Sequence, residues 1–136
     1  MNKTQMRKFV KRHGGNNIKV IFSDTGWYAA QVLSENVIAV NLKIKLINWG
    51  YRELLLHEIG HIKGETLNYS SVSKSEYVAQ KWAIEYSKNN RMGNISKNLI
   101  RAAQRWANMK WNSENGCWRK YILAAKKLLK ELENKD

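Results

Sequence analysis

The pentapeptide His57-Glu58-Ile59-Gly60-His61 constrains this chain more than any other stretch. On an α-helix, residues four apart lie on one face about one turn from each other, so the two imidazoles can converge on a single metal ion. Glu58 is not a ligand in this arrangement. It lies beside the metal's open position, where a carboxylate can take a proton from water and pass it to a leaving amine. The pattern therefore predicts a metal-binding helix with a general base, and a helix with two ordinary histidines is the alternative.

The motif supplies two ligands, whereas a catalytic zinc site needs a third and an open position. The chain has one further histidine, His13, which lies far upstream, and one cysteine, Cys117. A single cysteine excludes both an intramolecular disulfide and a thiolate-rich zinc cage. The metzincin pattern is also excluded, because its third ligand would fall on Leu67. The remaining candidates are carboxylates downstream of the motif.

Three downstream glutamates are candidates for the third ligand. Glu65 follows the motif by only four residues, and a glycine that ends the helix intervenes. Glu85 remains an alternative. Glu76 is favoured, because its helix continues through small residues that would let it approach the motif helix closely. The stretch from Ser73 to Glu76 is also a capping-box sequence, so a purely structural Glu76 is the competing interpretation.

The length of 136 residues predicts one domain, and the pattern of elements predicts an α+β fold. We expect a small zincin-like domain, in which a short antiparallel or mixed three-stranded sheet packs on the motif helix and a helical half follows. Its parts are a basic N-terminal arm or helix (1–15), the sheet (16–47), the metal-site helices (48–92) and basic C-terminal helices (93–136).

Apolar periodicity and turn residues give the individual elements. The predicted helices are 4–12, 48 or 49–63, 73–91, 95–111 and 117–133, and the predicted strands are 18–22, 27–33 and 37–44. The third strand alternates apolar with small or polar residues, which predicts one buried face. Gly60 would cost a helix about 1 kcal/mol relative to alanine, so we expect close approach by another segment or by the metal site, with random tolerance as the alternative.

The net charge of +13 is unevenly distributed. It is +6 for residues 1–47, −1 for 48–86 and +8 for 87–136. The basic ends could bind nucleic acid or an acidic protein, although 17 of the 24 cations are lysines, which is typical of a solvated surface. No apolar run approaches a membrane span, and the N-terminal segment lacks the apolar core of a secretory signal. We therefore expect a soluble, cytoplasmic protein without a membrane partner.

Three runs together resemble the ImmA/IrrE family of metallo-endopeptidases. They are Asn36-Val-Ile-Ala-Val-Asn41, Leu54-Leu-Leu-His-Glu-Ile-Gly-His61 and Glu76-x-x-Ala79-x-x-Trp82-Ala83. In that family a strand precedes an HELGH-type helix, and a following helix carries a Glu-x-x-Ala-x-x-Phe-Ala pattern whose Glu binds zinc. The resemblance covers residues 37–86.

The resemblance implies a zinc site of His57, His61 and Glu76, with Glu58 as the general base. It also implies cleavage of a specific cytoplasmic protein, such as a helix-turn-helix repressor of a phage or mobile element or a related stress regulator. A non-proteolytic regulatory module that binds nucleic acid or protein on a zincin scaffold is the alternative function.

Two further parts of the site are expected for a peptidase. An extended substrate would add a strand along the edge strand formed by Val37, Ile38, Ala39, Val40 and Asn41. The developing oxyanion needs a hydrogen-bond donor, for which Tyr69 and Tyr77 are candidates.

Overall fold

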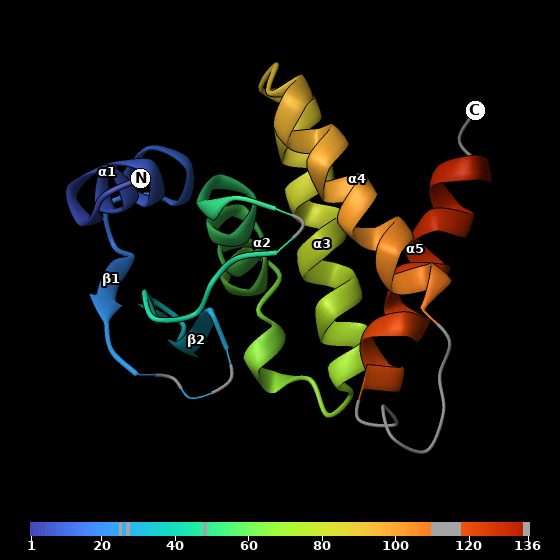
Figure 1. Ribbon diagram of the computed structural model, residues 1–136, viewed down its shortest axis with the longest axis horizontal. Helices are drawn as coiled ribbons and strands as arrows, with labels where there is room; N and C mark the ends of the chain where they lie inside the picture. The colour runs from blue at the N-terminus through green and yellow to red at the C-terminus, as the bar shows by residue number, and fades with distance from the viewer. Residues whose placement is uncertain (25, 27, 48, 110–117, 135–136) are drawn as a thin grey trace.

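The computed structural model describes residues 1–24, 26, 28–47, 49–109 and 118–134. In these ranges the fold is α+β, with five α-helices, a 3-10 turn and a small mixed sheet. Helix α2 (Tyr51–Lys63) stands at the centre (Figure 1). On one side of it lie the sheet and α1 (Lys3–Gly14), and on the other lie α3 (Val72–Asn89), α4 (Gly93–Asn108) and α5 (Arg119–Asn134). The motif helix is thus covered on both sides.

Helix α1 (Lys3–Gly14) is the predicted basic N-terminal helix. Asn2 caps it, since its side chain accepts a hydrogen bond from the Gln5 amide and the Gln5 side chain accepts one from the Asn2 amide. Met6 and Val10 are fully buried on one face, while the helix's lysines and arginines are exposed. One apolar stripe therefore fixes α1 to the core and leaves its cations in solvent.

The sheet consists of β1 (Lys19–Phe22), β2 (Ala30–Ser34) and β3 (Val37–Val40), in the order β1-β3-β2. β1 runs parallel to β3, and β2 pairs with β3 as an antiparallel hairpin. The predicted start of the second strand at Trp27 lies outside the described residues. The sheet is mixed, and β3 is its central strand.

The predicted third strand over 37–44 is too long, and its predicted single buried face is wrong. β3 ends at Val40, and Ile38, Ala39 and Val40 are all buried, as expected for a strand covered on both faces. Asn41 then turns the chain, because its side chain bonds to Asp24 and to the Lys43 amide. The alternation beyond residue 40 therefore belongs to a turn.

Helix α2 is buried from Glu53 to Gly60 without interruption. Glu53 accepts a hydrogen bond from the Gly50 amide at the helix start and another from the Asn98 side chain, which ties α2 to α4. The predicted start at Asn48 lies outside the described residues. Its central position explains why α2 can carry buried polar groups: several elements are close enough to satisfy them.

A 3-10 turn, η1 (Thr66–Asn68), leads from α2 to α3 (Val72–Asn89). A Cβ on Gly60 would overlap the carbonyl oxygen of Ala79 and lie 3.0 Å from its Cα. The expected close approach at Gly60 is therefore confirmed, and the approaching segment is α3. This contact sets how near the side chains of α3 come to the motif.

The C-terminal half consists of α4 (Gly93–Asn108) and α5 (Arg119–Asn134). Both pack against α3 and against each other, with Leu99, Ala103 and Leu128 in the buried face. The predicted end of the first helix at Trp111 and start of the second at Cys117 lie outside the described residues. Among the described helices, none has the length and apolar character that crossing a membrane requires.

Candidate metal centre

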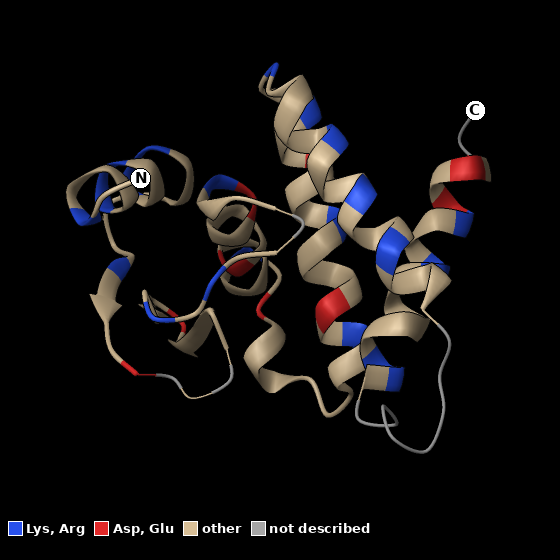
Figure 2. Cartoon of the chain, in the orientation of Figure 1, with Lys and Arg blue, Asp and Glu red and all other residues tan. Residues whose placement is uncertain are grey.

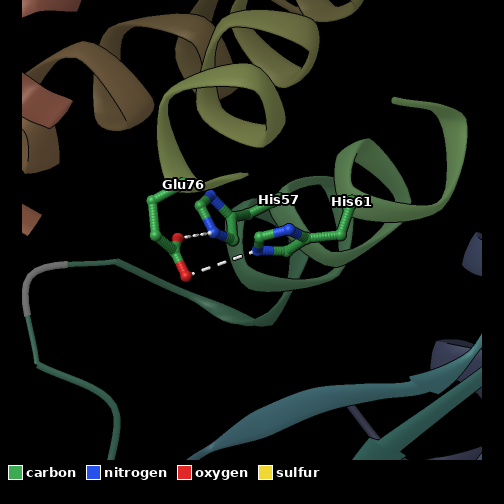
Figure 3. Close-up of side chains that lie close together, drawn as sticks. All are labelled: His57, His61 and Glu76. Atoms are coloured by element: carbon green, nitrogen blue, oxygen red, sulfur yellow. Dashed lines mark hydrogen bonds and ion pairs between the residues drawn. The ribbon is translucent and has the colours of Figure 1, made fainter. Parts of the chain in front are cut away.

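Three side chains from two helices converge beside α2 (Figure 3). His57 and His61 stand one turn apart on α2, and Glu76 reaches them from the N-terminal part of α3. Oε2 of Glu76 accepts a hydrogen bond from Nε2 of His57 at 2.7 Å, and Oε1 lies 3.4 Å from Nε2 of His61. Their ligand atoms lie within 4.8 Å of one another, a grouping found at no other place among the described residues. These three residues can hold a metal ion.

Each imidazole is oriented by a partner on its other nitrogen. Nδ1 of His57 donates to Oε1 of Gln80 at 2.6 Å, and Gln80 in turn donates to the carbonyl of Leu99 at 2.8 Å. Nδ1 of His61 lies 2.7 Å from the Thr66 hydroxyl and 3.1 Å from that of Ser75. Such partners fix the ring and its tautomer, so both Nε2 atoms remain directed at Glu76.

The capping interpretation of Glu76 is wrong. Helix α3 begins at Val72, and its N-cap is Ser71, whose hydroxyl accepts a hydrogen bond from the Lys74 amide at 3.2 Å. Glu76 therefore lies inside the helix, and its carboxylate is directed at the histidines. Glu65 is exposed in the turn between α2 and η1, and Glu85 lies farther along α3. Neither belongs to the cluster.

The three ionisable groups strongly alter one another's pKa. Burial alone would lower the pKa of His57, but the charge and hydrogen bond of Glu76 outweigh it and raise this pKa to about 9. Burial would raise the pKa of Glu76, and the two histidines instead hold it well below its usual range. Burial and the charge on His57 lower the pKa of His61. At neutral pH the metal-free cluster is thus an ion pair between a His57 imidazolium and a Glu76 carboxylate.

Glu58 is buried in the wall of the same cleft. Burial raises the pKa of its carboxyl group to about 8, the negative charge of Glu76 raises it too, and the charge on His57 opposes both. A carboxyl group with a pKa near neutrality can both accept and return a proton during a reaction. The local chemistry is therefore suited to general acid–base work beside a metal.

A cleft of about 840 Å³ opens onto this cluster. One wall is β2 with the segment before it, the floor is α2 with the start of α3, and the opposite wall is formed by α4 and α5. The α4–α5 wall is rich in aromatic rings, with Trp106 stacked on Trp118 and on Tyr121 at centroid distances of 5.1 and 5.2 Å. The cleft is large enough for several side chains of an extended peptide.

The prediction that residues 37–41 form a free edge strand is wrong. Val37 to Val40 form the central strand, hydrogen-bonded on both sides, and the Asn41 side chain is occupied by the turn that follows. The strand that borders the cleft is β2, which pairs with β3 on its other side. The order of the strands in the sheet decides which strand has a free edge, and a single sequence does not reveal that order.

The two tyrosines considered as oxyanion donors lie in different settings. Tyr69 lines the cleft, and its ring faces the ammonium of Lys74, 5.2 Å from the ring centroid. Tyr77 has its hydroxyl turned to Glu131, to which it donates a hydrogen bond. The charge of that glutamate makes Tyr77 unsuited to meet an oxyanion.

Comparisons of the chain with protein-family models, with curated proteins and with solved structures found no match.

Sequence reasoning missed several residues that complete the site. Gln80 lies one helical turn after Glu76, so its position on the same face of α3 was a usable signal. Thr66 and Ser75 carried no such signal, because their hydroxyls reach His61 through the turn between α2 and α3. Tyr28 and Tyr121 come from opposite ends of the chain and share a hydrogen bond.

Proposed function

We propose that His57, His61 and Glu76 bind a zinc ion and that the protein is a zinc-dependent endopeptidase. The observation that carries the proposal is the position of Glu76, which meets the Nε2 atoms of both histidines at the wall of a cleft that also contains Glu58. Two imidazoles and one carboxylate are a donor set used by catalytic zinc, with a fourth position left for water or substrate. A purely structural site would have no need of a buried carboxyl group beside it.

The ligand set fits zinc better than the hard divalent cations. Calcium and magnesium prefer oxygen ligands, whereas this cluster offers two nitrogens and one carboxylate. The partners of the two Nδ1 atoms, Gln80 on one side and Thr66 with Ser75 on the other, match the outer hydrogen bonds that orient metal-binding histidines.

A bound zinc ion would supply Lewis acidity, which polarises a carbonyl group and lowers the pKa of water. Glu58 takes one proton from the attacking water as the new bond forms between the water oxygen and the carbonyl carbon. It then gives that proton to the amide nitrogen as the carbon–nitrogen bond breaks. The products are a carboxylic acid and an amine, and Glu58 returns to its starting state.

The substrate in this proposal is an extended polypeptide that adds a strand to β2. Ala30, Gln31 and Val32 of β2 line the cleft, so their main-chain groups are the natural partners of such a strand. We further propose, from the resemblance to ImmA/IrrE peptidases, that the natural substrate is a cytoplasmic protein such as a DNA-binding repressor. Narrow specificity would fit a cleft enclosed by walls from both ends of the chain.

Cleavage of a proteome-derived peptide library tests the proposal. The zinc-loaded protein should generate new N-termini, detectable by mass spectrometry, at sites that share a sequence preference. A chelator should abolish these cleavages and added zinc should restore them, because the ligands hold a removable ion. Full cleavage after complete zinc removal would contradict the assignment.

Gln80→Leu is expected to weaken zinc binding about 10- to 100-fold. The substitution removes the acceptor for Nδ1 of His57 and leaves the Leu99 carbonyl without the Gln80 donor. Competition with a chromophoric chelator measures the affinity. Gln104→Leu is the matched control, since Gln104 is exposed on α4. Equal affinities of the two variants would show that Gln80 does not orient the ligand.

Zinc binding at pH 7 is expected to release about one proton, because a ligand histidine must be neutral and the metal-free protein holds the pKa of His57 at about 9. Affinity should rise about tenfold per pH unit from pH 7 towards 9. In the metal-free protein the same proton stabilises the fold fully below pH 6.5, and this stabilisation falls as pH rises through about 9. Calorimetry in buffers of different ionisation enthalpy counts the protons, and no release would contradict the ion pair.

A second candidate function is a binding module for nucleic acid or an acidic protein. Lysines and arginines lie along α1, α4 and α5 (Figure 2). All five of those on α1 are exposed. Phosphate contacts through these residues would make binding fall steeply with salt. Salt-sensitive binding of duplex DNA by a protein that cleaves no peptide would favour this function over the peptidase.

A further inference from the structure

The proposed reaction requires a hydrogen-bond donor for the carbonyl oxygen as it gains negative charge. Glu58 is committed to moving the proton, so the donor must come from another cleft residue. All six tyrosines of the chain are described, and those lining the cleft are Tyr28, Tyr69, Tyr77 and Tyr121. The choice among these four decides which wall faces the scissile bond.

Two of the four are poorly suited. The Tyr77 hydroxyl donates to Glu131, and the Lys127 ammonium covers its ring 4.3 Å from the centroid, so it belongs to the outer contact between α3 and α5. The ring of Tyr69 faces the Lys74 side chain, which is long and rotationally free. A donor that stabilises a transition state must instead be held in place beforehand.

Tyr121 is held by aromatic packing on the α4–α5 wall. Its ring stacks on Trp106 at 5.2 Å with an interplanar angle of 29°, and Trp118 lies 6.4 Å away. The phenol is half-buried and shares a hydrogen bond with Tyr28, which stands before β2 on the opposite wall. The Tyr121 hydroxyl therefore projects across the cleft.

The electrostatic surroundings of Tyr121 keep it protonated. Burial, then the negative charge of Glu76, then Tyr28 and finally the charge of Glu58 raise the pKa of Tyr121 well above its usual range. Both the proposed zinc ligand Glu76 and the proposed base Glu58 are thus close enough to act on this phenol. A hydroxyl that stays protonated beside them is a hydrogen-bond donor throughout the neutral range.

We infer that Tyr121 is a catalytic residue whose hydroxyl donates a hydrogen bond to the scissile carbonyl oxygen as it becomes an oxyanion. This inference rests on the proposed peptidase function. In the free protein the hydroxyl is engaged with Tyr28, so the two phenols bridge the cleft between α5 and the start of β2. A peptide lying along β2 displaces Tyr28, which is half exposed, and takes up the Tyr121 donor.

Two variants that break the same bond separate this role from a structural one. Tyr121→Phe and Tyr28→Phe each remove the phenol–phenol hydrogen bond while keeping the ring, but only Tyr121→Phe removes the proposed donor. With a peptide selected from the library, Tyr121→Phe should lower kcat about 10²-fold and leave KM and zinc content nearly unchanged. Tyr28→Phe should lower kcat less than about tenfold, because the donor remains.

A binding measurement provides a second readout. A phosphinic analogue of the selected peptide resembles the tetrahedral transition state, and its calorimetric Kd should rise about 10²-fold in Tyr121→Phe. Equal losses in both variants, or unchanged kcat and Kd in Tyr121→Phe, would overturn the inference while leaving the peptidase proposal standing. If the zinc-loaded wild-type protein cleaves no peptide of the library, the proposed function and the inference both fail.

Discussion

Glu58→Gln is expected to lower kcat/KM by about 10³-fold and to leave zinc bound at one ion per chain. Loss of a general acid–base group typically costs 10²- to 10⁴-fold. The amide has nearly the same shape as the carboxyl group but cannot accept the proton of the attacking water. Zinc should stay, because Glu58 is outside the cluster of three ligand residues. Library cleavage and metal analysis on the same preparation measure both quantities.

The matched control is Glu65→Gln. Glu65 undergoes the same chemical change but is exposed in the turn between α2 and η1, outside the residues that line the cleft. Its kcat/KM and zinc content should equal those of the wild type. Retained turnover in Glu58→Gln would remove this residue from the mechanism, whereas loss of zinc from it would mean that the carboxyl group supports the metal rather than the reaction.

The part of the site that depends on helical spacing was predictable. Residues 57 and 61 lie on one face of any α-helix, and Glu76 follows at the start of the next helix. Gly60 also carried usable information, because glycine inside a buried helix is unfavourable unless another backbone needs the space. The structure supplies that backbone at Ala79. Local periodicity therefore predicted the two helices, and the glycine predicted the contact between them.

The arrangement of the sheet was not predictable in the same way. Residues 37–40 form a strand in either case. Whether that strand is central or at an edge depends on its parallel pairing with β1, from which β2 separates it in the sequence but not in the sheet. That pairing is a contact between segments that are not adjacent in the sequence, and the hydrophobic periodicity of the sequence does not indicate it. The free edge consequently belongs to β2 rather than to β3, and the expected substrate position moves with it.

Tyr121 shows the same limit for the site. It lies on the last helix, and an apolar stripe accounts fully for its sequence position among Trp118, Ile122 and Ala125. Only the packing of α5 beside α3 and α4 brings its hydroxyl to the cleft opposite Tyr28. A residue that the tertiary structure brings to the site, rather than spacing along one helix, can be identified only once the fold is known.

Gly60→Ala is expected to destabilise the protein by about 2 kcal/mol and to weaken zinc binding together with it. The added methyl would overlap the backbone of Ala79, which cannot rotate away as a flexible side chain can. Overpacking of this kind costs roughly 1–3 kcal/mol or more, against about 1 kcal/mol gained from the better helix propensity of alanine. Helix α3 must move outward, and Glu76, three residues before Ala79, would move with it.

Thermal unfolding of the metal-free protein and chelator competition measure the two effects, with a fall in Tm of roughly 7 °C expected from the size of the domain. Ala79→Gly should not rescue the variant, since the overlap is with main-chain atoms. Gly93→Ala is the matched control, because a Cβ there meets nothing within 4 Å. If Gly60→Ala lost stability but bound zinc normally, Glu76 would not depend on the spacing between α2 and α3. The joint loss is expected because one glycine sets both the packing of these helices and the reach of the third ligand.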